Sequence, residues 1–443
     1  MPDLRTPGAF APVFPWRRDS YTADDLRQLR DLLRRSNTFD FPALPNGLFP
    51  AAHLRAEAQY TGYSHVWVRD NIHVAHAHLA VGEAAVACRT VRALLEYFGR
   101  HRYRFEAIID GRADPAVPMN RPHIRFDGNT LREVAEDWSH AQNDALGYLL
   151  WLASRLHLAG AMALTAGETD LLSLFPAYFR AIRYWEDRDS GHWEEKRKVE
   201  ASSIGAVVAG LEAFRQVLPS PDGAVPLDPL IAAGRDALQR ILPWESIDGE
   251  NAREYDSALL FLIWPLDVAD ASQRERILAG VETMLGGEAG VRRYLGDSFW
   301  CADYDLLVAE EQRTANVSEQ MSVRDALMKP SQEAQWCIFD PVLSVIYGRK
   351  FLAGGARHDH EKQVHHFNRA LAQLARREDA PESWLCPELY YLRRGRWEPN
   401  DVTPLLWTAA NLMVALHVMQ QTAGRQAAGI RAKKTLVSSM NAG

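Results

Sequence analysis

Helical periodicity covers most of this 443-residue chain and is the feature that most limits its fold. Apolar residues recur three and four positions apart in successive segments, whereas alternating strand patterns are scarce. Pro176 and Pro341 fall inside two of these segments, where they predict a kink or a split. About a dozen helices without a long linker between them predict one all-α domain. The expected helices are Asp24–Ser36, Asn71–Gly99, His140–Leu164, Asp170–Asp187, Ser202–Val217, Asp228–Ile241, Glu254–Ile263, Ala271–Leu285, Ser331–Tyr347, His358–Arg376 and Thr403–Met419.

Charge and composition exclude several classes of partner. The net charge of -7 and the pI near 6.1 argue against a nucleic-acid partner, which normally requires a basic surface. No apolar run is long enough to span a bilayer, and the N-terminal residues do not resemble a signal peptide, so we expect a cytoplasmic location and no membrane partner. Cys88, Cys301, Cys337 and Cys386 share no metal-ligand spacing, which predicts four reduced, buried thiols. The sequence does not specify an oligomeric state.

Two charged segments lie directly before predicted apolar helices. The first is Tyr63–Asn71 (YSHVWVRDN), in which Arg69 offers a rigid fork of donors and Asp70 can cap the following helix. The second is Asp137–Gly147 (DWSHAQNDALG), which gathers Trp138 and several polar side chains at a helix entry. A helix cap with a salt bridge is the better explanation of the first segment taken alone, and capping, with Asp144 in the first turn, also explains the second.

Two further segments each place a glutamate beside aromatic residues. In Gly191–Gly205 (GHWEEKRKVEASSIG), a carboxyl next to Trp193 can lie in an apolar pocket, where burial raises its pKa as a general acid requires. In Glu382–Trp407 (ESWLCPELYYLRRGRWEPNDVTPLLW), Glu388 is a candidate general base. From the residues alone, a solvated acidic and basic turn is an equally good interpretation of the first segment, and the signal in the second segment is weak by itself.

In this order, the segments resemble those of glycoside hydrolase family 15, the glucoamylase-like family. They are even more similar to its relatives, the regulatory α and β subunits of phosphorylase kinase. The combination is WVRDN, DWSHAQNDALG, WEE with EASSIG, RYLGD, and PELYY before TPLLW, between Tyr63 and Leu416. The resemblance implies an (α/α)6 barrel with the site in loops at one end. It divides the chain into an N-terminal segment with one helix on the barrel (1–40), the catalytic barrel (41–424) and a flexible tail (425–443).

The resemblance also assigns roles to individual residues. Glu194 matches the general acid of the family and Glu388 its general base, which implies hydrolysis with inversion and carboxyl groups roughly 6.5–9.5 Å apart. The family pattern alone selects Glu194 over Glu195 as the acid. No metal and no organic cofactor is expected. The expected substrate-binding residues are Tyr63, Trp67, Arg69, Asp70, Trp138, Trp193, Glu195, Arg293 and Trp336.

The sequence departs from fungal glucoamylases where the basic run Lys196–Lys198 follows the acid. We therefore weigh three functions. The first is an exo-acting inverting α-glucosidase that releases β-glucose from short α-glucosides or from α-glucan ends. The second is a catalytically silent glucan-binding or regulatory protein of the kinase-subunit type, in which the basic run obstructs the pocket. The third is a hydrolase of another sugar, such as trehalose.

Overall fold

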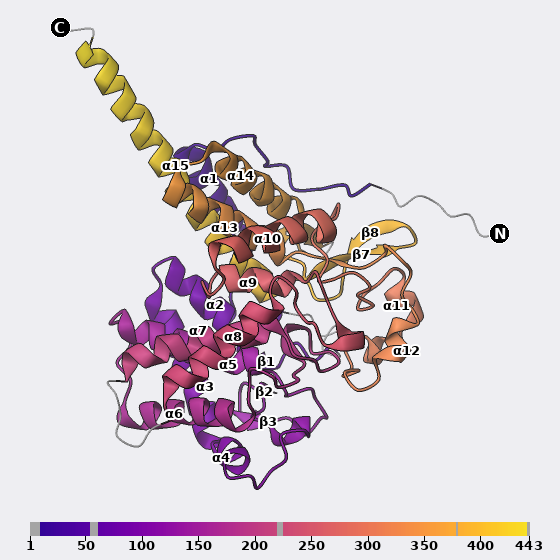
Figure 1. Ribbon diagram of the computed structural model, residues 1–443. Helices are drawn as coiled ribbons and strands as arrows, with labels where there is room; N and C mark the ends of the chain where they lie inside the picture. Colours follow the sequence, from indigo (N-terminus) through magenta and orange to yellow (C-terminus); the bar gives the residue numbers. More distant parts are fainter. Residues whose placement is uncertain (1–8, 54–60, 219–224, 378–379, 441–443) are drawn as a thin grey trace.

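The computed structural model describes residues 9–53, 61–218, 225–377 and 380–440. Its helices form an (α/α)6 barrel, which confirms the fold class expected from the sequence (Figure 1). In the described part of the chain, six helices form a closed inner ring in which each contacts the next and the last contacts the first. They are α2 (Val68–Ala80), α5 (Asn143–Leu158), α7 (Ala201–Val217), α9 (Leu260–Ile263), α13 (Phe339–Gly354) and α15 (Leu406–Met440).

Each inner helix packs against one helix of an outer ring. The outer helices are amphipathic, since one face packs inward and the other meets solvent; in α1, for example, Leu26, Leu29 and Leu33 are buried among charged neighbours. Within the described residues the outer partners, in the order of the inner helices given above, are α3 (Ala84–Arg100), α6 (Ala166–Ala181), α8 (Leu227–Ile241), α10 (Ala271–Gly280), α14 (Arg357–Ala372) and α1 (Ala23–Arg35).

Glycines let the inner helices α5 and α7 approach one another closely. A Cβ atom on Gly147 would lie 2.5 Å from the backbone carbon of Ala206, and one on Gly210 would lie 2.7 Å from the carbonyl oxygen of Gly147. Any side chain at either position would push the helices apart. The glycine that ends the DWSHAQNDALG motif is therefore explained by helix packing.

Short strands and helices fill the loops between the long helices. The sheets are all antiparallel: β1 (Val66–Trp67), β2 (Arg125–Asp127) and β3 (Arg132–Glu133) form one, and β4 (Gln335–Trp336), β7 (Leu389–Arg393) and β8 (Arg396–Pro399) form another. β5 (Ala375–Arg377) pairs with β6 (Ala380–Leu385). The short helices are α4 (Tyr103–Ile109), α11 (Tyr304–Leu307) and α12 (Met321–Asp325). In Figure 1, α11 and α12 lie on the side of the molecule that carries β7 and β8, away from the projecting end of α15.

Several predicted helices have different limits in the structure. The segment Asn71–Gly99 forms two helices, because Gly82 takes a φ of 93° between them and turns the chain back. Pro176 stays inside α6 without splitting it. Pro341 lies in the first turn of α13, where a helix needs no donor from it, so no break follows.

The two ends of the predicted barrel can also be compared with the structure. α1 begins at a capping box in which Thr22 and Asp25 exchange hydrogen bonds, and it packs on α15. At the other end, α15 runs as a helix to Met440, and its carboxyl end projects from the body (Figure 1). A flexible tail from residue 425 stays a prediction. Alanine, lysine, arginine and glutamine are strong helix formers, and they are frequent in this stretch.

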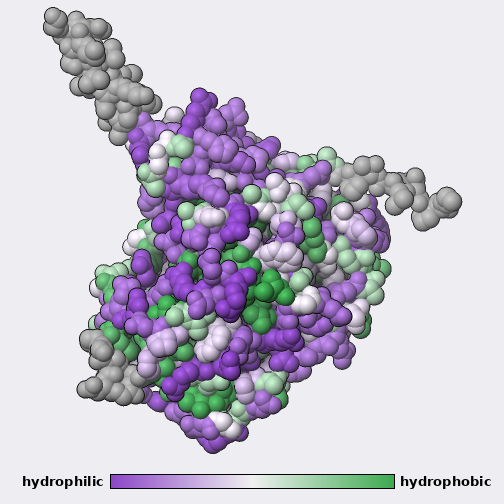
Figure 2. Space-filling model, in the orientation of Figure 1, coloured by the Kyte–Doolittle hydropathy of each residue, from purple (hydrophilic) through white to green (hydrophobic). Residues whose placement is uncertain are grey.

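The surface and the cysteines fit a water-exposed barrel. The face in Figure 2 is mostly hydrophilic, with hydrophobic residues gathered in patches near the middle of the view. Among the described helices, none combines the length and the apolar character needed to cross a membrane. All four cysteines are free thiols; Cys301, Cys337 and Cys386 are buried, and Cys88 is only partly buried.

Candidate active site

The charged and aromatic motifs meet at one end of the barrel because each precedes the first turn of an inner helix. The segment around Arg69 leads into α2, Trp138 precedes α5, and Glu194 precedes α7. Trp336 precedes α13, and Glu388 precedes α15. The amino ends of these helices therefore point toward the same loops, and their partial positive charge favours carboxylates there.

These loops line a pocket whose empty volume of about 790 Å³ includes space open to solvent. It contains both candidate catalytic glutamates and every expected substrate-binding residue except Glu195. The pocket is lined by Ala51, Tyr63, Trp67, Arg69, Asp70, Trp138, His192, Trp193, Glu194, Arg293, Phe299, Thr314, Ala315, Asn316, Val317, Arg324, Trp336, Glu388, Leu405 and Trp407.

Glu194 is held by its backbone and by donors on one side-chain oxygen. It follows the short helical turn Gly191–Trp193 and takes a φ of 57°, a left-handed conformation that costs a non-glycine residue free energy. Its Oε1 accepts hydrogen bonds from Trp67 Nε1 at 2.8 Å and from Gln142 Nε2 at 3.1 Å. Arg69 Nη2 lies 3.5 Å from the same oxygen. The contacts seen for this carboxyl within the described residues thus all reach Oε1.

Arg69 is fixed by a buried ion pair at the floor of the pocket. Its Nη1 donates to Asp144 Oδ2 at 2.6 Å and to Gln142 Oε1 at 3.1 Å. Arg69 and Asp144 are both almost inaccessible to solvent, so the pair sets the position of the guanidinium group and leaves Nη2 toward Glu194. Asp144 and Gln142 belong to the DWSHAQNDALG motif, so polar residues of this motif hold Arg69 of the WVRDN motif in place.

Asp70 lies in the first turn of α2 and lines the pocket. The N-cap residue is Trp67, and no side chain caps the helix there, so the predicted capping role of Asp70 is wrong. Burial raises the pKa of Asp70 to about 7, although the neighbouring Arg69 acts in the opposite direction. The carboxyl group is therefore available to a ligand in the pocket.

Glu388 lies at the start of β7 and is held on all sides. Its backbone N–H donates to Val402 and its carbonyl accepts from Cys337. Its side chain accepts a hydrogen bond from Tyr63 Oη at 2.8 Å on Oε1 and one from Asn400 Nδ2 at 2.6 Å on Oε2. Burial raises the pKa of Glu388 to about 7, and the two donors moderate that rise.

Aromatic side chains form two walls of the pocket. On one wall, Trp67 lies 5.3 Å from Tyr63 and 6.0 Å from Trp138, measured between ring centroids. On the other, Trp193 and Trp336 are 5.8 Å apart, and the guanidinium of Arg293 lies 4.9 Å from the Trp336 ring centroid. Such walls offer flat apolar faces with polar edges, which suit a ring that has C–H faces and hydroxyl edges.

Glu195 is turned away from the pocket into a cluster of cations. Its Oε1 accepts hydrogen bonds from Arg293 at 2.9 Å and Arg324 at 2.6 Å, and its Oε2 accepts one from Tyr294 Oη at 2.6 Å. Burial alone would raise the pKa of Glu195, but the surrounding arginines outweigh it and hold the pKa far below its usual range. Glu195 therefore stays ionised, and its placement gives it the task of positioning arginines that line the pocket.

The basic run that follows Glu195 does not enter the pocket. Lys198 forms an ion pair with Glu200, and both side chains are buried. Arg197 Nη1 donates to the carbonyl of Ala116 at 2.7 Å, and Lys196 is exposed. None of the three residues lines the pocket, so the run does not obstruct it.

Several pocket residues were not expected from the sequence. His192 contacts Ser202 Oγ through Nδ1 and Tyr148 Oη through Nε2, both at 3.1 Å, and it stacks on Phe261. Asn400 does not line the pocket, but it donates a hydrogen bond to Glu388. It lies between Pro399 and Asp401 in the segment that contains the PELYY motif, where an amide gives no distinguishing signal. Phe299, Arg324 and Thr314–Val317 come from a long loop with little sequence pattern, and Ala51, Leu405 and Trp407 complete the lining.

The charges around the pocket suit a neutral ligand. The cations Arg69 and Arg293 are each paired with a carboxylate behind the pocket wall, Asp144 and Asp297 respectively. The lining carboxyls of Asp70, Glu194 and Glu388 then leave no excess of positive charge for an anionic substrate. Across the described residues, no group of three or more histidine, cysteine, aspartate and glutamate side chains is arranged to hold a metal ion.

Comparisons with known proteins show what the chain is similar to. A family model described as Glycosyl hydrolases family 15 matches residues 38–222. A probable phosphorylase b kinase regulatory subunit alpha of Caenorhabditis elegans is 27% identical over 311 residues, which are 62% of this chain and 24% of that protein. The chain thus spans about a quarter of that relative's length.

Solved structures share the fold at low identity. A glycosidase variant in complex with glucose is 18% identical, with a TM-score of 0.63 over 90% of this chain and 99% of that chain. A glucoamylase from Saccharomycopsis fibuligera is 12% identical, with a TM-score of 0.56 over 93% of this chain and 98% of that chain. The resemblance to glycoside hydrolase family 15 and to its phosphorylase kinase relatives is confirmed, and it supports a glycosidase.

Proposed function

We propose that this chain, a relative of the family 15 glycoside hydrolases, is an exo-acting inverting α-glucosidase that releases β-glucose from short α-glucosides. The observation that carries the proposal is that Glu194 and Glu388 face one pocket walled by aromatic residues. Tyr63 and Trp67 link them, because Tyr63 donates to Glu388, Trp67 donates to Glu194, and the two rings lie 5.3 Å apart. Inverting glycosidases use two carboxyl groups that flank the scissile bond.

Glu194 is the general acid in this proposal. Glu194 Oε1 accepts hydrogen bonds from Trp67 and Gln142, so the proton of the acid is carried by Oε2. Oε2 then donates that proton to the glycosidic oxygen as the bond to the anomeric carbon breaks. The left-handed backbone at Glu194 directs this side chain into the pocket, while the next residue, Glu195, points away.

Glu388 is the general base. Hydrogen bonds from Tyr63 and Asn400 reach both of its oxygens and stabilise the carboxylate form. The carboxylate takes a proton from the water that attacks the opposite face of the anomeric carbon. A raised pKa would by itself suit an acid as well, but a carboxyl with a donor on each oxygen has no free oxygen from which to donate its proton.

The residues at the floor of the pocket hold the glucose unit that is removed. Arg69 and Asp70 supply charged hydrogen-bonding groups, and Trp67 and Trp138 supply ring faces. Their rotamers are fixed by contacts outside the pocket, such as the Arg69–Asp144 ion pair, so they bind the sugar with little reorganisation. An electron-poor transition state at the anomeric carbon is stabilised by the nearby carboxylates.

A regulatory protein without activity is the second candidate, since the chain is similar to a phosphorylase kinase subunit. That candidate would be favoured by a blocked pocket or by a catalytic glutamate that points elsewhere. The structure shows the basic run outside the pocket and both glutamates within it, which supports the enzyme.

The test is glucose release from maltose, isomaltose, trehalose, maltotriose and isomaltotriose, with the anomer of the product identified by NMR. Initial formation of β-glucose supports an inverting α-glucosidase, and the best substrate identifies the linkage. Initial formation of α-glucose would contradict inversion. If the folded protein hydrolyses none of these sugars, the proposed activity is wrong, and a binding screen against longer glucans would test the regulatory candidate.

A further inference from the structure

A segment between α11 and α13 closes one side of the pocket. We call Glu310–Leu327 the wall segment; it contains α12 and the turn before it. Five of its residues line the pocket: Thr314, Ala315, Asn316, Val317 and Arg324. The wall segment lies in the long loop after the RYLGD motif, and none of its residues was among those expected to bind substrate.

Consecutive residues after the proposed acid fasten the wall segment to the acid loop. Glu195 accepts a hydrogen bond of 2.6 Å from Arg324, and both side chains are buried. The backbone N–H of Lys196 lies 3.2 Å from the sulfur of Met321, and Arg197 lies 3.5 Å from Glu319. The basic run that distinguishes this chain from fungal glucoamylases thus contacts the wall segment instead of entering the pocket.

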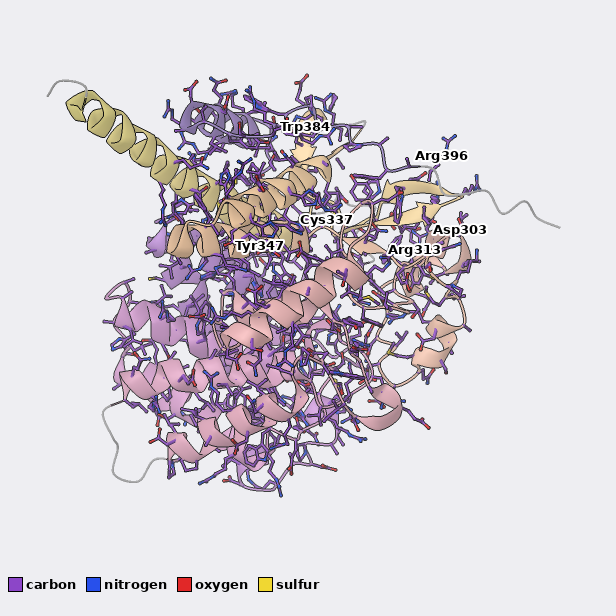
Figure 3. The ribbon with its side chains drawn as sticks, turned by 45° about the horizontal axis from the view of Figure 1, so that its top comes forward. Asp303, Arg313, Cys337, Tyr347, Trp384 and Arg396 are labelled. Atoms are coloured by element: carbon purple, nitrogen blue, oxygen red, sulfur yellow. The ribbon has the colours of Figure 1, made fainter. Side chains whose placement is uncertain are left out.

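Other contacts fasten the wall segment to the loop of the proposed base. Arg313, three residues into the segment, donates to Asp401 at 2.8 Å, next to the Asn400 that holds Glu388. Its carbonyl accepts from Tyr304 Oη, and its Nη2 donates to the carbonyl of Asp305. Figure 3 shows Arg313 near Asp303 at the edge of the molecule that also carries Arg396 of β8. The wall segment is therefore tied to both catalytic loops.

The position of the proposed acid shows which part of a substrate meets this wall. Glu194 protonates the oxygen between the glucose that is removed and the leaving sugar, so the leaving sugar lies on the far side of Glu194 from Arg69 and Asp70. Residues 195–197 follow Glu194 directly, and they are the residues that hold the wall segment. A leaving group therefore approaches Asn316, Val317 and Arg324.

We propose that the wall segment is a specificity determinant that limits the leaving group to a single sugar unit, so that the enzyme prefers disaccharides to longer glucosides. The inference rests on the proposed function, because it assigns the leaving side of the same pocket. A longer leaving chain would have to displace Arg324, which the buried ion pair with Glu195 holds in place. Displacing one partner of such a pair is costly, since it leaves a charge buried without its counterpart.

The test compares kcat/KM for a disaccharide and a heptasaccharide of the same linkage, in the α-1,4 and the α-1,6 series. The wild-type protein should favour the disaccharide by about tenfold or more, a size typical of steric exclusion from a pocket. The double variant Asn316→Gly/Val317→Gly lowers the wall and should raise the relative rate on the heptasaccharide by about tenfold. The single variant Val317→Ala, which makes a smaller change to the loop, should move the ratio in the same direction.

Val323→Ala is the matched control, since Val323 lies on the same segment, is 70% exposed and does not line the pocket. It should leave the ratio of the two rates unchanged. Equal wild-type rates on both lengths, or wall variants that fold and keep the wild-type ratio, would overturn the inference while the proposed activity stands.

If the protein hydrolyses no glucoside, the proposed activity is wrong. Sugar binding then tests whether the wall segment limits the length of the ligand. The tryptophans that line the pocket provide a fluorescence signal for titration with maltose, isomaltose and their heptasaccharides. Tighter binding of a disaccharide than of its heptasaccharide, abolished by Asn316→Gly/Val317→Gly, supports the wall. Equal binding of both lengths, or no binding of any of the four sugars, would overturn it.

Discussion

Two groups of buried charges in this barrel show opposite behaviour. In the pocket, burial raises the pKa of Asp70 and of Glu388 to about 7. Between α10, α13 and α14 lies an outer cluster of Glu282, Asp340, Tyr347, Lys362, His366, Arg369 and Gln373. There, burial also acts to raise the pKa values of Glu282 and Asp340, but paired donors lower both to about 2.

The number of cationic donors explains the difference. Glu282 accepts hydrogen bonds from Tyr347, Lys362 and His366, and Asp340 accepts them from His366, Arg369 and Gln373. Within the described part of the chain, the hydrogen bonds to the side chain of Glu388 come from the neutral donors Tyr63 and Asn400, and Arg293 acts on its pKa by charge without a hydrogen bond. Figure 3 places Tyr347 of the outer cluster well away from Arg313 and Asp303, which lie on the side of the wall segment. A buried carboxyl that has no cationic hydrogen-bond donor can still bind a ligand or exchange a proton, whereas one paired with several cations stabilises the fold.

The largest expected effect is the loss of activity on neutralising the proposed base. Glu388→Gln should lower kcat/KM by about 10²–10⁴-fold, because the variant cannot accept a proton from water. The same change removes a buried carboxyl with a raised pKa, so thermal unfolding should show no loss of stability. If Glu388→Gln keeps the wild-type rate, Glu388 is not the base, and its role is structural, like that of the carboxyls in the outer cluster.

Neighbouring glutamates provide a second test of the comparison. Glu194→Gln should cost about 10²–10⁴-fold in kcat with the fold intact, since it removes the proton donor. Glu195→Gln should instead lower stability by about 3–5 kcal/mol, because it leaves Arg324 buried without this carboxylate and Arg293 with Asp297 alone. The test measures the rate and the urea unfolding of both variants. If Glu194→Gln keeps the wild-type rate while a folded Glu195→Gln loses activity, Glu195 is the general acid instead of Glu194.

Breaking the outer cluster should affect stability alone. Asp340→Asn leaves His366 and Arg369 without their shared carboxylate, at a cost of about 3 kcal/mol. Urea unfolding measures the loss, and kcat/KM measured below the unfolding transition should equal that of the wild type. A large fall in activity without a fall in stability would mean that this cluster also takes part in the reaction.

The pH dependence of activity should follow Glu388. Its pKa of about 7 in the empty pocket predicts that kcat/KM rises with pH up to about 7, as the base becomes ionised. Asn400→Ala removes a donor that lowers this pKa, so the rise should move to higher pH. Asp70→Asn should shift the rise in the opposite direction: the Asp70 charge raises the pKa of Glu388, so its removal should lower activity and move the rise to lower pH.

The smallest expected effect is a pH dependence of stability from His366. Hydrogen bonds to Asp340 and Glu282 raise its pKa above 6.5 despite burial, which acts to lower it. Its contribution is therefore complete below pH 6.5 and is lost as the pH rises through the higher folded value. The difference in unfolding free energy between wild type and His366→Gln should be larger at about pH 5.5 than at about pH 9. A constant difference would show that His366 does not titrate in this range.

Helical periodicity predicted most of the fold, because a helix depends on spacing within a short stretch of chain. Ser202–Val217 and Asp228–Ile241 nearly coincide with α7 and α8. Periodicity does not reveal a single residue that reverses the chain direction, such as Gly82 within an alanine-rich stretch. Periodicity within a segment also cannot predict that the inner ring is closed, since the contact between α2 and α15 joins helices far apart in the sequence.

The candidate site was predicted largely through the order of its motifs, and the structure adds the contacts between them. Nothing in the pattern WEEKRK shows that Glu194 turns into the pocket and Glu195 away, because that depends on a φ of 57° and on arginines far along the chain. Asn400 and the wall segment were missed for the same reason. Their contacts with Glu388 and Glu195 are made between loops that have no common local pattern.

The closed inner ring has a consequence for the way this chain is made. α15 completes the ring by packing against both α13 and α2, and it is the last ring helix to leave the ribosome. Until it emerges, apolar faces of α2 and α13 have no covering helix, and such exposed faces invite association with other unfinished chains. Contacts between the first and last ring helices also give the fold a high contact order, which slows folding. The barrel should therefore depend on chaperones during synthesis more than its mature stability would indicate.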